Sequence, residues 1–127
     1  MILVDTSVWI DHLRKNDMQL VQLLLSGMVV IHPFIIGEIA CGNLKNRDKI
    51  LSLLNNLELV KEATNKEVNY LIENQQLMGK GIGYIDAHLL ASCLISQSTT
   101  IWTRDKRLLT QATRLAIHYQ DQDQGQH

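Results

Sequence analysis

The sequence predicts an α/β fold, namely a single compact α/β/α domain with a central parallel sheet of four to five strands flanked by helices. Short apolar, β-branched segments alternate with helical patterns along the chain, which is typical of parallel strands whose faces are covered by helices. The chain has 127 residues, of which 46% are hydrophobic and 20% charged. A chain of this size and composition can form one domain with a substantial core.

Local signals place the helices. Thr6 or Ser7 is a natural N-cap for the first helix, Gly27 ends the second, and Pro33 begins the third, where its missing N–H is not needed. The segment 84–96 is apolar on most sides, so we expect a deeply buried helix there. The expected helices are residues 7–15, 18–26, a segment starting at residue 33, and residues 47–57, 65–78, 84–96 and 106–114.

Short apolar segments between these helices predict the strands. The expected strands are residues 2–4, 28–32, 57–61, 99–103 and 115–118. Together these elements define one domain over residues 1–119. The remaining segment, "QDQDQGQH" at residues 120–127, is polar, and we expect it to be a disordered tail.

Composition also indicates the compartment. No apolar run approaches the roughly 20 residues of a membrane span, and Asp5 interrupts an apolar start that lacks the basic region of a signal peptide. Cys41 and Cys93 lie in apolar helical patterns without a CxxC pair or a His/Cys cluster. We interpret both as reduced core residues and expect a cytoplasmic protein without membrane contact.

Two predicted strands lead directly to an aspartate. "ILVDTS" places Asp5 after the first strand, and "IWTRDK" places Asp105 after a later one. The functional crevice of a parallel sheet lies beyond the carboxyl ends of its strands, so we expect both aspartates at that edge. Taken singly, each aspartate is equally well explained as the N-cap of the helix that follows it.

Two further acids complete a candidate site. Asp86 would lie in the first turn of the buried helix, where the helix dipole favours an anion. Glu38 lies among apolar neighbours in "PFIIGEIACG", although the outer face of its helix is also open to it. Asp5, Glu38, Asp86 and Asp105 in one cleft would repel one another. Mg²⁺ or Mn²⁺, which prefer oxygen ligands, would relieve that repulsion, so we predict that these four acids are catalytic and bind the metal.

Hydroxyl and basic side chains lie close to these acids in the sequence. We interpret Thr6, Ser7 and Thr103 as hydroxyls that orient a carboxylate, although helix capping and β propensity explain them equally well. A net charge of −1 alone argues against a nucleic-acid partner, but acids that bind cations would leave a basic excess elsewhere. The candidate phosphate contacts, which solvated helix ends could also explain, are Arg104, Arg107, Lys80 and Arg14.

Several other sites are excluded. "GKGIG" lacks the third glycine of a dinucleotide-binding turn and does not match a P-loop. Ser7 occupies the second acidic position of the D-x-D motif of haloacid-dehalogenase phosphatases. His88 falls in the buried helix, and we interpret it as a core histidine with satisfied hydrogen bonds rather than as an acid or base.

Four segments together resemble PIN-domain ribonucleases, specifically the VapC-like toxins of type II toxin–antitoxin systems. They are "MILVDTSVWIDHL", "IGEIACG", "GIGYIDAHLLASCL" and "TIWTRDKRLL". Their order and spacing fit the family over nearly the whole chain except the tail. The resemblance implies a PIN-like fold, a Mg²⁺- or Mn²⁺-dependent endoribonuclease that cleaves tRNA or ribosomal RNA, a homodimer, and a VapB-like antitoxin that forms a heterooligomer with the toxin.

Two other functions are weighed against this one. A small phosphohydrolase acting on metabolites would use similar acids, but the D-x-D motif is missing and no segment predicts a cap domain. A non-catalytic scaffold would not need a repulsive cluster of four acids.

Overall fold

The sheet consists of four parallel strands. In the computed structural model, which describes residues 1–121, the strands are β1 (Ile2–Val4), β2 (Val29–Ile31), β3 (Glu58–Leu59) and β4 (Thr100–Trp102). Their order across the sheet is β3-β2-β1-β4, and each neighbouring pair is parallel. The predicted α/β fold is therefore confirmed. Residues 122–127 of the expected tail lie outside the described residues.

The expected strand at residues 115–118 forms only one bridge. His118 pairs in parallel with Ile101, and the Ile101 N–H donates to the Ile117 carbonyl at 2.8 Å. Ala116 has a φ of 60°, so the chain leaves the last helix through a left-handed residue. Only a short stretch then lies alongside β4 before the described chain ends.

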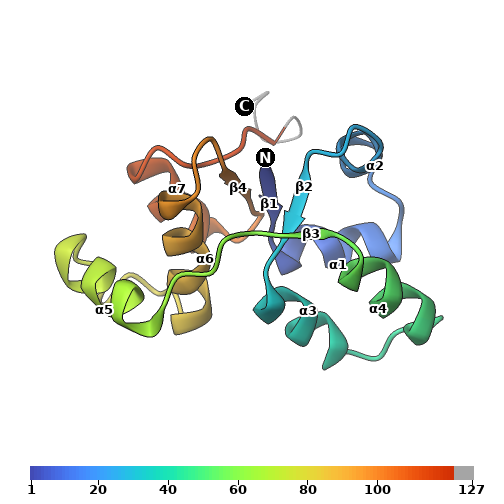
Figure 1. Ribbon diagram of the computed structural model, residues 1–127, viewed down its shortest axis with the longest axis horizontal. Helices are drawn as coiled ribbons and strands as arrows, with labels where there is room; N and C mark the ends of the chain where they lie inside the picture. The colour runs from blue at the N-terminus through green and yellow to red at the C-terminus, as the bar shows by residue number, and fades with distance from the viewer. Residues whose placement is uncertain (122–127) are drawn as a thin grey trace.

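Seven helices in residues 1–121 surround this sheet (Figure 1). Nearly all their ends lie within two residues of the expected positions. The exception is the fifth, which ends four residues early, because Gln76 just beyond it has a φ of 53° and cannot continue the helix. The helices are α1 (Thr6–Arg14), α2 (Met18–Leu25), α3 (Pro33–Ala40), α4 (Arg47–Asn55), α5 (Asn65–Asn74), α6 (Tyr84–Ile95) and α7 (Lys106–Arg114).

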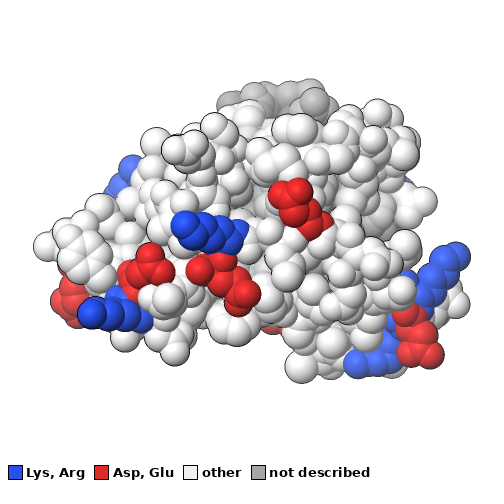
Figure 2. Space-filling view, in the orientation of Figure 1, with Lys and Arg blue, Asp and Glu red and all other residues white. Residues whose placement is uncertain are grey.

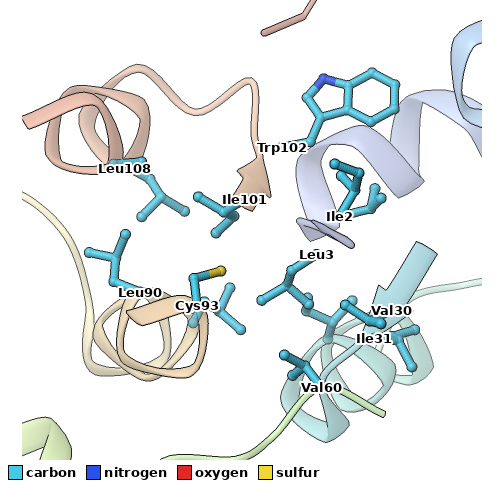
Figure 3. Packing of buried hydrophobic residues seen from close by; sticks show 14 of the residues in the cluster. Ile2, Leu3, Val30, Ile31, Val60, Leu90, Cys93, Ile101, Trp102 and Leu108 are labelled. Atoms are coloured by element: carbon cyan, nitrogen blue, oxygen red, sulfur yellow. The ribbon is translucent and has the colours of Figure 1, made fainter. Parts of the chain in front are cut away.

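Helices cover both sides of the strands. Figure 1 shows α5, α6 and α7 on one side and α1, α2 and α4 on the other. Neighbouring side chains of β4 point to opposite sides: in Figure 3, Ile101 lies toward Leu90 and Cys93 of α6, and Trp102 points away from them. All four side chains are buried. The helix predicted to be deeply buried, α6, therefore packs directly on the sheet.

The two cysteines differ in environment. Cys93 is buried, and burial raises the pKa of its thiol to about 12. Cys41 follows α3 and is exposed, so the expectation of a core residue was wrong. It lies on the same exposed helical stripe as Phe34, Gly37 and Glu38, because residues three, four and seven positions apart share one face of a helix. None of the helices in residues 1–121 has the length and apolar character needed to cross a bilayer.

The parallel topology gathers the helix starts at one edge. Helices α1, α3 and α7 each begin directly after β1, β2 and β4 respectively. Because these strands are parallel, the three junctions lie at the same edge of the sheet. This is the edge at which the sequence placed its candidate site.

Candidate active site

Asp5 is buried at this edge and held by two hydroxyl groups. The residue is only 6% exposed, and its Oδ2 accepts hydrogen bonds from Ser7 Oγ at 2.8 Å and Thr103 Oγ1 at 2.7 Å. Asp5 occupies the N-cap position of α1, but its side chain makes no capping hydrogen bond. The expectation that Thr6 or Ser7 caps this helix was therefore wrong, and capping does not explain Asp5 either.

Both hydroxyls are oriented toward Asp5 by backbone groups. The Arg104 N–H donates to Ser7 Oγ at 3.0 Å, and the Asp105 N–H donates to Thr103 Oγ1 at 3.1 Å. Because each hydroxyl thus accepts a hydrogen bond, its own proton is available to Asp5. The third predicted hydroxyl, on Thr6, donates instead to Glu38 Oε1 at 2.8 Å.

Asp105 differs from Asp5 because it caps its helix. Its Oδ1 accepts the N–H groups of Arg107 and Leu108, each at 3.0 Å. Asp105 is also exposed. Capping and a role in the site are compatible, since both capping bonds use one carboxylate oxygen and leave Oδ2 for a further ligand.

Asp86 shows that the four acids share one electrostatic environment. Its Oδ2 accepts the Gly83 N–H at 3.2 Å at the start of α6. Burial raises the pKa of Asp86, and the negative charges of Asp5, Asp105 and Glu38 raise it further. The structure therefore places all four predicted acids close together, on β1–α1, α3, α6 and β4–α7.

The negative charge of this cluster is not balanced by lysine or arginine. In residues 1–121, the ion pairs between side chains involve Arg104 and none of the four acids. A carboxylate cluster without protein cations fits Mg²⁺ or Mn²⁺, which take oxygen ligands. Within residues 1–121, no three His, Cys, Asp or Glu side chains lie close enough together to form a complete set of metal ligands.

Arg104, predicted to contact phosphate, is instead paired inside the protein. Its guanidinium contacts Asp11 at 2.9 Å, Asp121 at 2.8 Å and also Asp17, and it lies 5.3 Å from the centroid of the Trp102 ring. Burial acts to lower the pKa of Arg104, but the hydrogen bonds to these aspartates outweigh it and raise the pKa above its usual value. The structure therefore gives Arg104 a role in joining α1, the start of α2 and the C-terminal segment to β4.

The other candidate phosphate contacts are exposed. Arg107 packs against Gly81, in the loop that contains Lys80. The packing is so close that a Cβ at Gly81, whose φ is 79°, would lie 2.5 Å from Arg107 Cδ. This loop leads directly into the start of α6. Arg14 lies at the end of α1 and lines a groove with Leu13, Asn43 and Lys45. Figure 2 shows small, scattered groups of both charges on one face rather than a continuous basic surface.

Comparison with known proteins identifies the family. The sequence model of the PIN-domain family matches residues 2–114. The chain belongs to the PIN-domain family. It is also similar to Ribonuclease VapC32 of two strains of Mycobacterium tuberculosis, with 48% identity over 108 residues, which cover 85% of this chain and 87% of that protein. The resemblance to VapC-like PIN ribonucleases is confirmed, and all four acids lie within the matched residues.

Sequence reasoning missed all three acids of the Arg104 cluster, of which Asp11 lies on α1. Asp17 caps α2 by accepting the Leu20 N–H, a pattern that local sequence signals can identify. Asp121 is 3% exposed and also accepts a hydrogen bond from Trp102 Nε1 at 2.9 Å. It lies in a polar Gln/Asp run that was expected to be a tail, and no local signal distinguishes it from its neighbours.

Proposed function

We propose that the protein is a divalent-metal-dependent endoribonuclease that acts as the toxin of a toxin–antitoxin pair. One observation carries the proposal: four carboxylates from four separate segments share one environment and form no ion pair with a lysine or arginine of residues 1–121. The similarity to Ribonuclease VapC32 supports RNA as the substrate. Cleavage of tRNA or ribosomal RNA would stop translation and growth.

Asp5, Glu38, Asp86 and Asp105 would hold Mg²⁺ or Mn²⁺ in this proposal. When bound, such a cation stabilises negative charge on a phosphodiester and makes water more acidic. Ser7 and Thr103 keep the Asp5 carboxylate in one orientation, and Thr6 does the same for Glu38. Asp105 keeps its position through its hydrogen bonds to the first turn of α7.

Exposed basic side chains would bind the RNA backbone beside these acids. Arg107 and Lys80 are suited to this role because both are exposed and Arg107 contacts Gly81 in the loop that contains Lys80 and leads into α6. Arg14, at the end of α1, is a further candidate. Contacts of this type position the phosphate chain without reading base sequence.

The proposal includes two protein partners. A VapB-like antitoxin would cover the active site, and exposed apolar side chains would be buried in a homodimer. The exposed apolar groove between α5 and α6, which Tyr70, Leu71 and Leu94 line, is one candidate for such contacts. We place the reaction in the cytoplasm, where translation and its RNAs are found.

The main test is to map RNA ends after brief induction of the chain in cells. We expect cuts at defined positions in one class of structured RNA, with 5′-phosphate and 3′-hydroxyl ends, and growth arrest. Asp5→Asn should remove both effects. Normal growth and an unchanged set of RNA ends would favour a non-catalytic scaffold, and turnover of small phosphate esters would favour a phosphohydrolase.

Metal binding has a test that does not depend on activity. Added MnCl₂ should raise the thermal midpoint of the chain, since a ligand that binds the folded state stabilises it. Asp5→Asn should reduce this increase. An equal increase in both proteins would place the metal elsewhere.

A further inference from the structure

His88 lacks the hydrogen bonds expected of a core histidine. It is 3% exposed, and neither of its ring nitrogens has a hydrogen-bond partner in residues 1–121. Buried polar groups are usually paired, so such a group calls for an explanation. The interpretation of His88 as a satisfied core histidine was wrong.

Aromatic rings surround His88 instead. The Phe34 ring lies 4.9 Å from it at 73°, and the Tyr84 ring lies 4.8 Å from it at 83°, measured between ring centroids. His32 lies 4.8 Å from Phe34 and 6.3 Å from His88. These three ring contacts of His88 are edge-to-face, a geometry that aromatic pairs favour. His88 therefore acts as a buried support between Phe34 and Tyr84.

The two supported rings remain accessible to solvent. Phe34 is 38% exposed and Tyr84 is 47% exposed. Phe34 is the single phenylalanine of the chain, yet it lies at the surface, whereas Trp9 and Trp102 are buried. Phenylalanine is among the residues most often buried in proteins, so its exposed position next to a second exposed ring is unusual.

Phe34 lies beside the carboxylate cluster, and Tyr84 adjoins Phe34 through His88. Phe34 precedes Glu38 by four residues, so the two share one face of α3 with Cβ atoms about 5–6 Å apart. Tyr84 begins α6, and its ring contacts His88 one turn later on the same face, whereas Asp86, two residues on, points to another face of the helix. A base that stacks on Phe34 could therefore lie next to the carboxylates that face the phosphate of the same nucleotide, and Tyr84 extends the aromatic surface.

The rings are also held in place before any ligand arrives. The Tyr84 hydroxyl donates to Asn69 Oδ1 at 3.2 Å, and the Phe34 ring packs against the rings of both His88 and His32. Binding to side chains that are already ordered loses less conformational entropy than binding to mobile ones. This arrangement suits a flat, rigid ligand.

We propose that Phe34 and Tyr84, supported by His88, form a stacking site for an unpaired RNA base next to the phosphodiester that is cut. Proteins bind single-stranded RNA by stacking unpaired bases on aromatic side chains. The inference rests on the proposed function and adds a prediction of where the RNA is cut. The cut should fall in a loop or bulge, because a base paired within a duplex cannot reach these rings.

Binding measurements with defined RNAs test the proposal. The probes are an RNA stem-loop and a fully paired duplex of equal length, with Ca²⁺ in place of Mg²⁺ to slow cleavage. Phe34→Leu and Tyr84→Leu keep an apolar side chain but remove the ring. Each should weaken stem-loop binding about 5- to 100-fold and leave duplex binding unchanged. The slope of affinity against salt should also stay unchanged, since stacking displaces no counter-ions.

Two control variants separate the ring from other effects. Tyr84→Phe keeps the ring and should retain most of the affinity. Tyr70→Leu removes a 70% exposed ring on α5 and should bind the stem-loop as the unmodified chain does. Thermal midpoints of all variants show whether packing around His88 is lost.

Replacing loop bases one at a time by abasic ribose identifies the stacked base. One abasic position should weaken binding to the unmodified chain but cause no further loss in Phe34→Leu or Tyr84→Leu, because the partner ring is already absent. Unchanged stem-loop affinity in both leucine variants would overturn the stacking site. So would a loss of dimer or antitoxin binding with RNA affinity intact, since the rings would then contact protein. If the unmodified chain binds neither RNA, the proposed function itself fails.

Discussion

The β1–α1 and β4–α7 junctions look alike in sequence and differ in structure. Each has an apolar strand, then an aspartate in the N-cap position of a helix. Asp105 caps its helix and is exposed, whereas Asp5 makes no capping bond, is buried, and receives two hydroxyl hydrogen bonds. The difference comes from Thr103, which reaches Asp5 across the sheet. A strand–aspartate–helix pattern therefore locates an acid but does not determine what its oxygens bind.

The arginines near the second junction differ in the same way. Arg104 is paired with three aspartates and is 18% exposed in its side chain. Arg107, three residues later, is exposed against the Gly81 loop. The alternation of side chains after β4 directs Arg104 away from the four candidate metal-binding acids and toward Asp11, Asp17 and Asp121. The start of α7 directs Arg107 outward. Substitutions at both junctions can test these two comparisons.

Substitution of Asp5 should have the largest effect. Asp5→Asn removes one negative charge at the same volume, and we expect cleavage to fall about 10²- to 10³-fold, comparable to the removal of one preorganised electrostatic interaction in other enzymes. Asp105→Asn should reduce cleavage as strongly while stability stays unchanged, since asparagine caps helices as well as aspartate. RNA cleavage by the purified variants in Mg²⁺ measures this. Asp48→Asn, an exposed acid in the first turn of α4, is the matched control, and cleavage by Asp5→Asn near the original rate would exclude Asp5 from the site.

Removal of Arg104 should mainly lower stability. Arg104→Ala removes the guanidinium that Asp121 and the half-buried Asp17 bind, and we expect a loss of about 2–3 kcal/mol in the free energy of unfolding, below the range for fully buried pairs because of partial exposure. Arg107→Ala should change stability by less than about 0.5 kcal/mol. Urea denaturation of both variants measures the difference. Equal losses would mean that the Arg104 pairs are not stabilising.

The Arg104 contribution should depend on pH in a defined direction. Burial acts to raise the pKa of Asp17, but the bond from Arg104 and backbone bonds hold it below its usual value. The stability from this lowered pKa is present above the pKa of an unfolded aspartate, about 3.9, and is lost as the pH falls through the folded value. The stability difference between the original chain and Arg104→Ala should therefore shrink below about pH 4. Denaturation midpoints that keep a constant difference down to low pH would contradict this.

Loss of the two hydroxyl groups that donate to the Asp5 carboxylate should have an intermediate effect on cleavage. Ser7→Ala combined with Thr103→Val frees the Asp5 carboxylate to rotate, and we expect a roughly 10- to 100-fold loss, as for other residues that orient metal ligands. The concentration of MnCl₂ that gives half the thermal stabilisation should rise in the same variant. Thr110→Val is the control, because its hydroxyl donates to the Lys106 carbonyl of its own helix. An unchanged response to MnCl₂ would assign these hydroxyls a purely structural role.

The smallest effect should come from the exposed basic side chains. Arg107→Ala with Lys80→Ala should lower the slope of log affinity against log salt by about one unit for each phosphate that the variant no longer binds, with the cut site unchanged. Arg104→Ala should leave the slope as it is, because its guanidinium is occupied by aspartates. RNA affinity at several salt concentrations in Ca²⁺ measures both. A reduced slope in Arg104→Ala alone would reverse the assignment of the two arginines.

The sequence by itself determined the order of the helices and of the first four strands, and it placed four acids as candidates for one site at one edge of the sheet. These features depend on local signals, such as Pro33 at a helix start or an apolar strand before Asp5, which act over a few residues. The matching family model supports the same order of elements.

Only the tertiary structure decided which side chains contact one another. Thr103 bonds Asp5 across 98 residues, and Arg104 reaches Asp11 across 93, because strand order places β4 beside β1. Likewise, Phe34, Tyr84 and His88 meet only because α3 and α6 begin near the same edge of the sheet. A hydroxyl, a guanidinium or an aromatic ring can bind any of several partners. The packing of distant elements chooses among them, so these partners could not be predicted from the residues alone.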